Sequence, residues 1–303
     1  MNRIVRKLTT KPVWWWERHR KYAIRDHYGL LPSLEVRPAE ARFVVLTTPQ
    51  TLNDALWAAW SWYRFLRPQG IELQLAVDGE MEAVALAAAR ALFPGVRIYN
   101  VNPWFDEIFA AWPRLRAFLR QHAFAKQVGL VLGLSRQGPV LYADHDVLAF
   151  SPPVELLEQM SRQTPCYFLD HEAGCHDPAL LETVRAMGLQ HIQRLNAGFL
   201  YVPQNALSAA LAERILADWN PLPHFYFTPQ TVMSVLMQEA GAQPLPEDRY
   251  VISNRRQFYW EEDVDYEAIA ARHFTGTVRH VLYRYGMPTL LRQGSRYAAE
   301  KRA

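Results

Sequence analysis

Hydrophobic and polar positions follow each other along the chain in blocks that predict strands and helices in turn. From residue 42 onward, short apolar runs are followed by longer segments with apolar residues at helical spacing. The predicted strands are 43–48, 71–77, 96–101, 166–169, 199–202 and 250–252, and the predicted helices are 53–65, 80–93, 207–219 and 228–239, with one or two more helices within 114–134. This alternation predicts an α/β fold with mostly parallel strands and right-handed crossovers.

Two aspartates interrupt one of the most apolar stretches of the chain. Asp144 and Asp146 lie between the apolar runs 140–142 and 147–148. This pattern predicts two carboxylates at the carboxyl end of a core strand, which is where open α/β sheets bind ligands. Burying two carboxylates without a cation costs several kcal/mol, and their hard oxygen atoms suit Mn²⁺ or Mg²⁺. The alternative is a solvated turn, which apolar runs on both sides disfavour.

Composition limits the class of protein. The 303 residues are half hydrophobic, which is enough for one large folded domain. No apolar run approaches the roughly 18 residues that a membrane-spanning helix requires. The N-terminus lacks the apolar core of a secretory signal, and Cys166 and Cys175 are too few for a disulfide framework. We therefore expect a cytoplasmic protein with two reduced, buried thiols.

Positive charge is concentrated at both ends of the chain. Residues 1–30 carry eight Lys or Arg against two acidic residues, and residues 272–303 carry seven against one. Together with Trp14–Trp16, this composition is typical of a segment at an anionic membrane surface, although the tryptophans packing on the domain is an equal alternative. We expect three parts: a basic, Trp-rich segment 1–40, a folded domain 41–282 and a basic tail 283–303.

Three further polar groups could accompany the acidic pair. The first is Asn196-Ala197-Gly198, where glycine at the predicted entrance of a strand permits close approach of a ligand. The second is His273 with Arg279, a metal ligand and an anion clamp. The third is the cluster 170–177, either a second metal site or, as we favour, a polar loop facing the same cleft.

Several chemistries lack their motifs. The sequence contains no Gly-x-Gly-x-x-Gly, no Gly-x-x-x-x-Gly-Lys-Ser/Thr and no Gly-x-Ser-x-Gly. Dehydrogenase, P-loop and serine-hydrolase functions are therefore disfavoured. Nucleic-acid binding is disfavoured as well, because the basic residues are not concentrated on the predicted folded body.

The acidic pair and these groups together resemble GT-A-fold glycosyltransferases, above all glycosyltransferase family 8 and related bacterial families. Four segments match in the family's order: 141–148 the Asp-x-Asp strand, 196–199 the Asn-Ala-Gly strand entrance, 229–230 the Asp-Gln pair and 273–279 the His-Phe-x-Gly-x-x-Lys ending. Two positions depart from the family pattern. Pro229 stands where the family has an acidic residue, and Arg279 stands where it has lysine.

The resemblance implies a role for each matching residue. A GT-A fold is a Rossmann-like, mostly parallel twisted sheet flanked by helices in a single catalytic domain. The residues with implied roles are Asp144, Asp146 and His273 for Mn²⁺ or Mg²⁺, Asp144, Arg279 and Lys126 for the nucleotide diphosphate, and Asn196 and Gln230 for the transferred sugar. From their places in the chain we also expect Thr47, in the first predicted strand, at the nucleotide, and Asp170, in the polar loop, at the sugar.

The resemblance also implies an activity. It predicts transfer of a sugar from a nucleotide sugar, with UDP-hexose as the expected donor, to a saccharide or glycolipid acceptor with retention of configuration, in the synthesis of cell-envelope polysaccharide at the inner face of the membrane. Two alternatives stay open: a sugar nucleotidyltransferase, and a non-catalytic binding protein with the same fold. The loop 46–51 has neither the glycine nor the lysine that the nucleotidyltransferases carry there.

Overall fold

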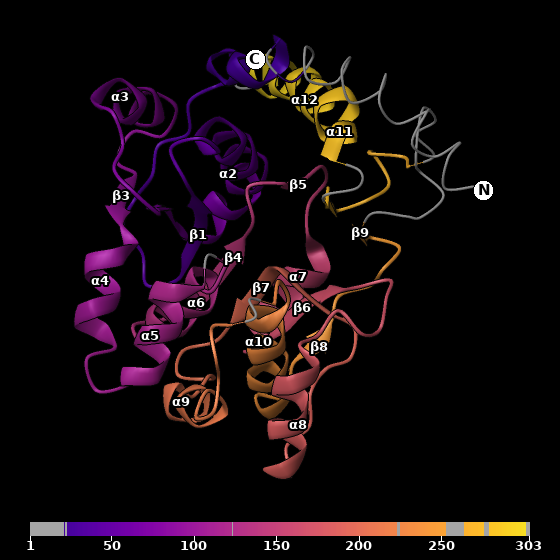
Figure 1. Ribbon diagram of the computed structural model, residues 1–303. Coiled ribbons are helices and arrows are strands. Elements are labelled where there is room, and N and C mark those ends of the chain that lie inside the picture. The colour runs from indigo at the N-terminus through magenta and orange to yellow at the C-terminus, as the bar shows by residue number, and fades with distance from the viewer. Residues whose placement is uncertain are drawn as a thin grey trace, which may run out of the picture.

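A twisted β-sheet runs through the middle of the protein (Figure 1). The structure, a computed structural model, describes residues 21, 23–122, 124–222, 225–252, 264–275 and 279–300. Its main sheet has the strand order β3-β2-β1-β4-β7-β6-β8 among these residues. The bounds are β1 Arg42–Thr47, β2 Glu72–Val77, β3 Arg97–Asn100, β4 Val140–Ala143, β6 Cys166–Leu169, β7 Leu195–Val202 and β8 Gln243–Pro244. A smaller sheet has the order β5-β10-β9, with bounds β5 Val147–Ala149, β9 Tyr250–Ile252 and β10 Ala271–His273.

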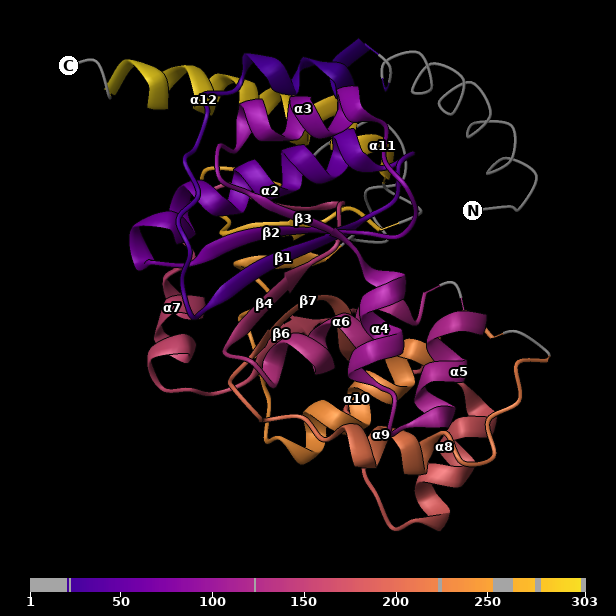
Figure 2. The same ribbon diagram turned by 90° about the vertical axis from the view of Figure 1, so that its left-hand side faces the viewer.

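Helices cover both faces of the main sheet. Their bounds are α2 Leu52–Leu66, α3 Ala83–Leu92, α4 Val101–Ile108, α5 Pro113–Gln121, α6 Lys126–Ser135, α7 Val154–Ser161, α8 Pro178–Ala186, α9 Ala209–Ile215, α10 Thr228–Glu239, α11 Arg279–Val281 and α12 Met287–Glu300. Short 3₁₀ turns span η1 Asp26–Leu30 and η2 Arg67–Gln69, and the π-helical turn η3 spans Leu282–Gly286. Figure 2 shows α2, α3 and α12 on one side of the sheet and α4, α5, α6, α9 and α10 on the other.

The sheet is apolar on both faces. In β1, Phe43 and Val45 belong to the hydrophobic core under α2, α3 and α12, whereas Val44 belongs to the core under α4–α6 and α8–α10. Successive side chains of a strand point to opposite faces, so a continuous apolar run is needed where helices cover both sides. The fold is therefore the predicted mixed α/β architecture with a mostly parallel sheet flanked by helices.

The strand directions bring distant parts of the sequence to one edge of the sheet. Strands β1, β2, β3 and β4 are parallel, so their carboxyl ends meet there. Strand β7 is antiparallel to β4, with Phe199 opposite Ala143, so its amino-terminal half reaches the same edge. In the smaller sheet, β10 pairs with β5 in a register that places His273 opposite Val147. His273 therefore lies next to the acidic pair.

Trp62 joins helix α2 to both sheets. Its indole is fully buried, stacks on Phe199 with a ring-centroid distance of 4.5 Å, and donates from Nε1 to the Val147 carbonyl oxygen at 3.1 Å. We expect Trp62→Phe to lower the free energy of unfolding by about 1–3 kcal/mol, because the hydrogen bond and part of the packing are lost. Chemical denaturation measures this change, and an unchanged midpoint would show that the site repacks without cost.

The predicted core elements are present, with corrections at their ends. The three strands within residues 43–101 are confirmed, and the segment 114–134 contains two helices, α5 and α6. The helix predicted over 207–219 is shorter, and α4, α7 and α8 were not predicted. Strand β7 begins at Leu195 rather than at Phe199, because the polar Asn196 pairs with β6 through an irregular register. Asn196 and Gly198 therefore lie inside the strand.

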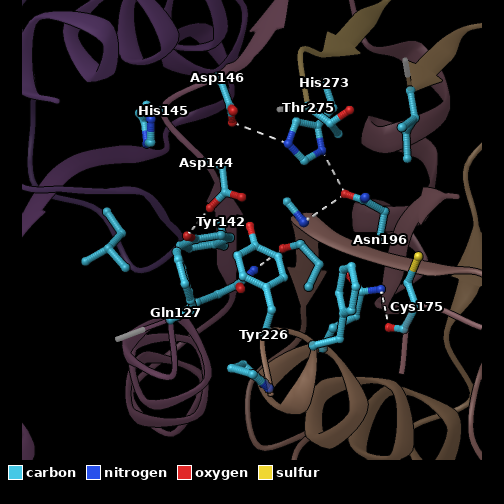
Figure 3. Close-up of a pocket in the computed structure, with 18 of the residues that line it drawn as sticks. Gln127, Tyr142, Asp144, His145, Asp146, Cys175, Asn196, Tyr226, His273 and Thr275 are labelled. Atoms are coloured by element: carbon cyan, nitrogen blue, oxygen red, sulfur yellow. Dashed lines mark hydrogen bonds and ion pairs between the residues drawn. The ribbon is translucent and has the colours of Figure 1, made fainter. Parts of the chain in front are cut away.

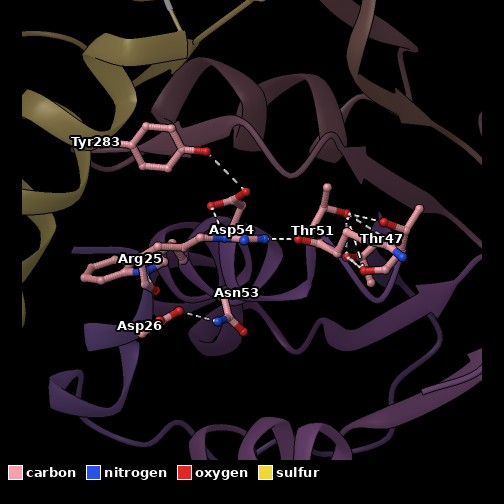
Figure 4. A network of polar contacts seen from close by, with 10 residues as sticks. Arg25, Asp26, Thr47, Thr51, Asn53, Asp54 and Tyr283 are labelled. Carbon is pink, nitrogen blue, oxygen red and sulfur yellow. Dashed lines mark hydrogen bonds and ion pairs between the residues drawn. The ribbon is translucent and has the colours of Figure 1, made fainter. Parts of the chain in front are cut away.

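Both terminal segments pack on helix α2. Arg25 Nε lies 3.0 Å from Asp54 Oδ1, and the Tyr283 hydroxyl donates to Asp54 Oδ2 at 3.3 Å (Figure 4). Helix α12 buries Met287 and Leu290 in the core, so the folded unit extends well beyond residue 282, where we predicted a tail. The amphipathic pattern of α12 allows this packing despite its basic charge. Trp14–Trp16 lie outside the described residues.

Two further sequence expectations concern the thiols and the membrane. Cys166 is free and buried, as expected, whereas Cys175 is free but half-buried, because it lines a pocket. Among the described residues, every helix is too short or too polar to cross a bilayer.

Candidate functional site

A pocket opens at the edge where the strands β1, β2 and β4 end and β7 begins. Its volume is about 1090 Å³, slightly above the range in which single small-molecule sites usually fall. The residues from sequence analysis that line it are Thr47, Asp144, Asp146, Asp170, Asn196, Gln230, His273 and Arg279. The structure thus brings together all of the predicted site residues except Lys126.

The acidic pair lies in a tight turn between β4 and β5. The Asp144 amide donates to the Gly198 carbonyl at 2.8 Å, and the Val147 amide donates to the Asp144 carbonyl at 3.1 Å, so the backbone is held on both sides. Asp146 is 2% exposed, whereas Asp144 is half-buried and faces the pocket. The Asp144 carboxylate also accepts a hydrogen bond from the Tyr142 hydroxyl.

His273 stands between Asp146 and Asn196 (Figure 3). Its Nε2 lies 3.3 Å from Asp146 Oδ1, and its Nδ1 lies 2.8 Å from Asn196 Oδ1. Because Asn196 Oδ1 also accepts from the Gly198 amide at 3.0 Å, it is an acceptor, and His273 Nδ1 therefore carries a proton. This arrangement directs Nε2 toward the acidic pair, as a metal-ligating imidazole requires.

The surroundings of the two carboxyl groups shift their pKa values in opposite directions. Burial alone would raise the pKa of Asp146, but the opposing charges of His273 and Arg279 hold it well below the usual range. Burial, and then the negative charge of Asp146, raise the pKa of Asp144. Burial acts to lower the pKa of His273, yet the charge of Asp146 raises it overall. The three groups therefore form one coupled unit.

These residues fit a divalent metal ion. Asp144, Asp146 and His273 each offer one ligand atom, and these atoms lie within 4.8 Å of one another. An imidazole Nε2 that faces a buried carboxylate oxygen at 3.3 Å requires a proton or a cation between the two atoms. Two carboxylate oxygens and an imidazole nitrogen are ligands suited to Mn²⁺.

The predicted phosphate contacts differ in their availability. Arg279 pairs with Asp146 Oδ2 and is 45% exposed toward the pocket, so its guanidinium stands beside the acidic pair. Lys126 is not among the lining residues, and its ammonium group lies 3.1 Å from Oδ2 of Asp78, a residue that does line the pocket. Thr47 is buried at the end of β1, where its hydroxyl lies 3.1 Å from the Thr48 carbonyl oxygen and 3.1 Å from the Thr51 hydroxyl.

The predicted sugar contacts lie together across the pocket. Asn196 Nδ2 donates to Asp170 Oδ2 at 3.0 Å, and Gln230 Nε2 donates to the Cys175 carbonyl at 3.0 Å. The amide of Asn196 is thus used for His273, Gly198 and Asp170, and this was not foreseen from sequence. It makes Asn196 a positioning residue for His273.

The cluster 170–177 is a polar loop. His171 Nε2 lies 2.9 Å from the Ile252 carbonyl oxygen, and His176 is buried with its Nε2 3.0 Å from the Gln193 carbonyl oxygen. Within the described part of the chain, the group of metal-ligand side chains that forms is Asp144, Asp146 and His273. The alternative of a second metal site at this loop therefore has no support.

We expect Asn196→Ala to weaken Mn²⁺ binding by about 10- to 100-fold, because His273 loses the acceptor that orients its ring. Calorimetry with Mn²⁺ measures the change, and Asn53→Ala, at the start of α2 and outside the pocket, is the control. Unchanged Mn²⁺ affinity would show that packing alone orients His273.

Sequence reasoning missed several residues of the pocket. Phe124, Gln127, Tyr142 and Tyr226 all line it. Tyr226 belongs to the aromatic run 225–227, a signal that was visible in the sequence but had no partner there. Its partner, Phe124, lies about a hundred positions away and meets it only in the fold.

This protein resembles known proteins in structure, whereas comparisons of sequence found no match. No protein-family model matches the chain, and no curated protein matches it by sequence. The structure of the galactosyltransferase LgtC, in complex with donor and acceptor sugar analogues, matches with a TM-score of 0.54 and 15% identity, over 83% of this chain and 95% of that chain.

Two further glycosyltransferase structures have similar scores. Mouse xyloside xylosyltransferase 1 matches with a TM-score of 0.50 and 13% identity, over 80% of this chain and 99% of that chain. The bifunctional glycosyltransferase WbbM matches with a TM-score of 0.51 and 15% identity, over 80% of this chain and 47% of that chain. The chain therefore has the GT-A fold of these glycosyltransferases.

Proposed function

We propose that this protein is a metal-dependent glycosyltransferase. It transfers a sugar, with retention, from a nucleoside-diphosphate sugar of the UDP-hexose type to a saccharide or glycolipid acceptor. The observation that carries the proposal is the group Asp144, Asp146 and His273, whose ligand atoms lie within 4.8 Å of one another at the carboxyl edge of a GT-A sheet. Arg279 supplies a positive charge at the same place.

The mechanism follows from where charge develops. The bond between the anomeric carbon and a diphosphate oxygen breaks, the acceptor hydroxyl oxygen bonds to that carbon, and the hydroxyl proton is released. The guanidinium of Arg279 stabilises the negative charge that grows on the diphosphate. A bound divalent ion supplies further electrostatic stabilisation of that leaving group.

The remaining residues hold the sugar and the metal ligands in place. Asp170 and Gln230 line the part of the pocket where the sugar lies, and the remaining lone pairs of their side-chain oxygen atoms accept hydrogen bonds from sugar hydroxyls. Asn196 keeps His273 oriented and bridges it to Asp170. The same asparagine thus couples the metal side of the pocket to the sugar side.

The proposed activity is tested by donor hydrolysis. The protein is incubated with Mn²⁺ and with UDP-glucose, UDP-galactose or GDP-mannose, and release of the nucleoside diphosphate is measured. We expect release from a UDP-hexose that stops when EDTA removes the metal. Release from GDP-mannose alone would refute the UDP assignment, and release from no donor would contradict the activity.

We also propose that the protein works in the cytoplasm at the inner, anionic surface of a membrane. The basic terminal charge supports this, because Arg292 and Arg296 are exposed on α12, and the N-terminal segment that carries Lys21 packs on the same helix as α12, namely α2. Sedimentation with phosphatidylglycerol vesicles should carry the protein down, and phosphatidylcholine vesicles should not. Equal behaviour with both lipids would overturn this proposal.

A further inference from the structure

Aromatic side chains form one wall of the pocket, away from the metal ligands. Phe124, at the start of α6, and Tyr226, just before α10, both line it and remain 49% and 58% exposed. Their ring centroids lie 4.6 Å apart at an interplanar angle of 59°, and Phe227 packs against Tyr226 at 5.0 Å. Large aromatic side chains that stay exposed beside a pocket mark contact surfaces.

A buried histidine joins the two loops that carry these rings. His122 is 1% exposed; its Nδ1 accepts from the Phe124 amide at 3.3 Å, and its Nε2 therefore donates to the Phe225 carbonyl oxygen at 2.9 Å. The same imidazole thus ties the segment before α6 to the segment before α10. The relative positions of Phe124 and Tyr226 are set before any ligand arrives, which lowers the entropic cost of binding.

Tyr226 extends into the pocket from the side opposite Asp146 and His273, with its hydroxyl directed toward Asp144 (Figure 3). Burial, and then the negative charge of Asp144, raise the pKa of Tyr226, so its hydroxyl is a donor at neutral pH. Among the described residues the structure gives this hydroxyl no hydrogen-bond partner. A polar group beside an apolar ring face suits a ligand that has both kinds of surface.

A sugar ring has these two kinds of surface. The axial C–H groups of a pyranose form an apolar patch that stacks on aromatic rings, while its hydroxyls need hydrogen-bond partners. Across the same pocket, Glu172 supplies carboxylate oxygens, next to Asp170 and Gln230, which we assign to the transferred sugar. Carboxylate oxygens accept hydrogen bonds from sugar hydroxyls, whereas an acyl chain offers them no donor.

The nucleotide has a different place in the pocket. The carboxyl ends of β1 and β2, with Thr47, Thr48 and Asp78, form the part of the pocket where α/β sheets hold nucleotides. The aromatic wall comes instead from the start of α6 and of α10. The pocket volume of about 1090 Å³ exceeds what one small ligand normally fills, so a second substrate has room beside the donor.

We infer that Phe124 and Tyr226, joined by His122, form a platform on which a pyranose ring of the acceptor stacks, so that the acceptor is a saccharide. This inference rests on the proposed function, because it assigns the second substrate of the same pocket. The stacked ring presents its hydroxyl toward the acidic pair, and the Tyr226 hydroxyl donates to the sugar.

Saturation-transfer NMR tests this platform. Methyl β-D-galactopyranoside, methyl β-D-glucopyranoside and methyl α-D-mannopyranoside are each added to the protein with Mn²⁺ and UDP. We expect saturation of the ring C–H protons of at least one glycoside, reduced by about 3- to 10-fold in Phe124→Leu and in Tyr226→Leu, which keep apolar bulk but lose the aromatic face. Tyr226→Phe should keep the stacking and lose only the hydroxyl contribution.

Leu222→Ala is the matched control, because Leu222 is 74% exposed near the same loop and is outside the pocket. Thermal unfolding of each variant shows that the fold is intact. Unchanged saturation in the leucine variants, or none with the wild-type protein, would refute the platform. A fall in UDP affinity instead would assign the rings to the nucleobase, and loss of vesicle binding instead would assign them to lipid. Mn²⁺-dependent UDP binding by the wild-type protein is measured in the same samples, so failure of the proposed function is recognised separately.

Discussion

We expect Asp146→Asn to lower Mn²⁺ affinity and sugar transfer by more than about 100-fold, beyond the usual cost of losing an outer-shell contact. The side chains of His273 and Arg279 converge on Asp146, which is 2% exposed. An asparagine of the same size removes the negative charge and leaves a neutral amide in that place. Metal binding, with its requirement for anionic oxygen ligands, should be lost.

The fold should survive this change. Arg279 is 45% exposed, so its charge remains hydrated when its partner is neutralised. Calorimetry with Mn²⁺ and donor hydrolysis measure the effect, thermal unfolding checks the fold, and Asp248→Asn at an exposed position is the control. A variant that keeps wild-type Mn²⁺ affinity would place the metal elsewhere.

Gly198→Ala is expected to have the second largest effect, although it adds a single methyl group. A Cβ atom at this position would stand 2.3 Å from His273 Cε1, 2.6 Å from His273 Nδ1 and 2.9 Å from Asn196 Oδ1. His273 is 7% exposed and held from both sides, so it must shift and its Nε2 must move relative to Asp146. We expect a loss of Mn²⁺ affinity of at least about tenfold and about 1–3 kcal/mol of stability.

Gly29→Ala is the matched control for this change, because a Cβ atom there would meet nothing within 4 Å. Equilibrium unfolding and Mn²⁺ calorimetry separate the two effects of Gly198→Ala. If Mn²⁺ affinity is unchanged while stability falls, the clash is relieved by the backbone and the position of His273 does not depend on Gly198.

The parts of the fold that follow from local pattern could be predicted. Apolar runs such as Phe43–Leu46 lie in strands covered on both faces, and the polar interruption at Asp144 and Asp146 indicates the edge of the sheet where ligands bind. His273 could be added because its chemistry matched the acidic pair. These inferences need only the sequence around each residue and its side-chain chemistry.

Contacts that depend on register and loop path could not be predicted in this way. Strand β7 begins earlier than its apolar run suggests, so Asn196 lies within the strand, and from there it orients His273. Lys126, at the start of α6, forms an ion pair with Asp78, which directly follows β2 and is far from Lys126 in the sequence. Phe124 and Tyr226 become neighbours through His122, whose buried hydrogen bonds no local pattern reveals.

The proposed function depends most directly on the coupling between metal and nucleotide at Asp144, Asp146 and His273. Calorimetric titration of UDP into the wild-type protein, once with saturating Mn²⁺ and once with EDTA, measures this coupling. We expect Mn²⁺ to strengthen UDP binding by about 5- to 150-fold, the usual range for linked sites. Equal UDP affinity with and without Mn²⁺ would contradict it.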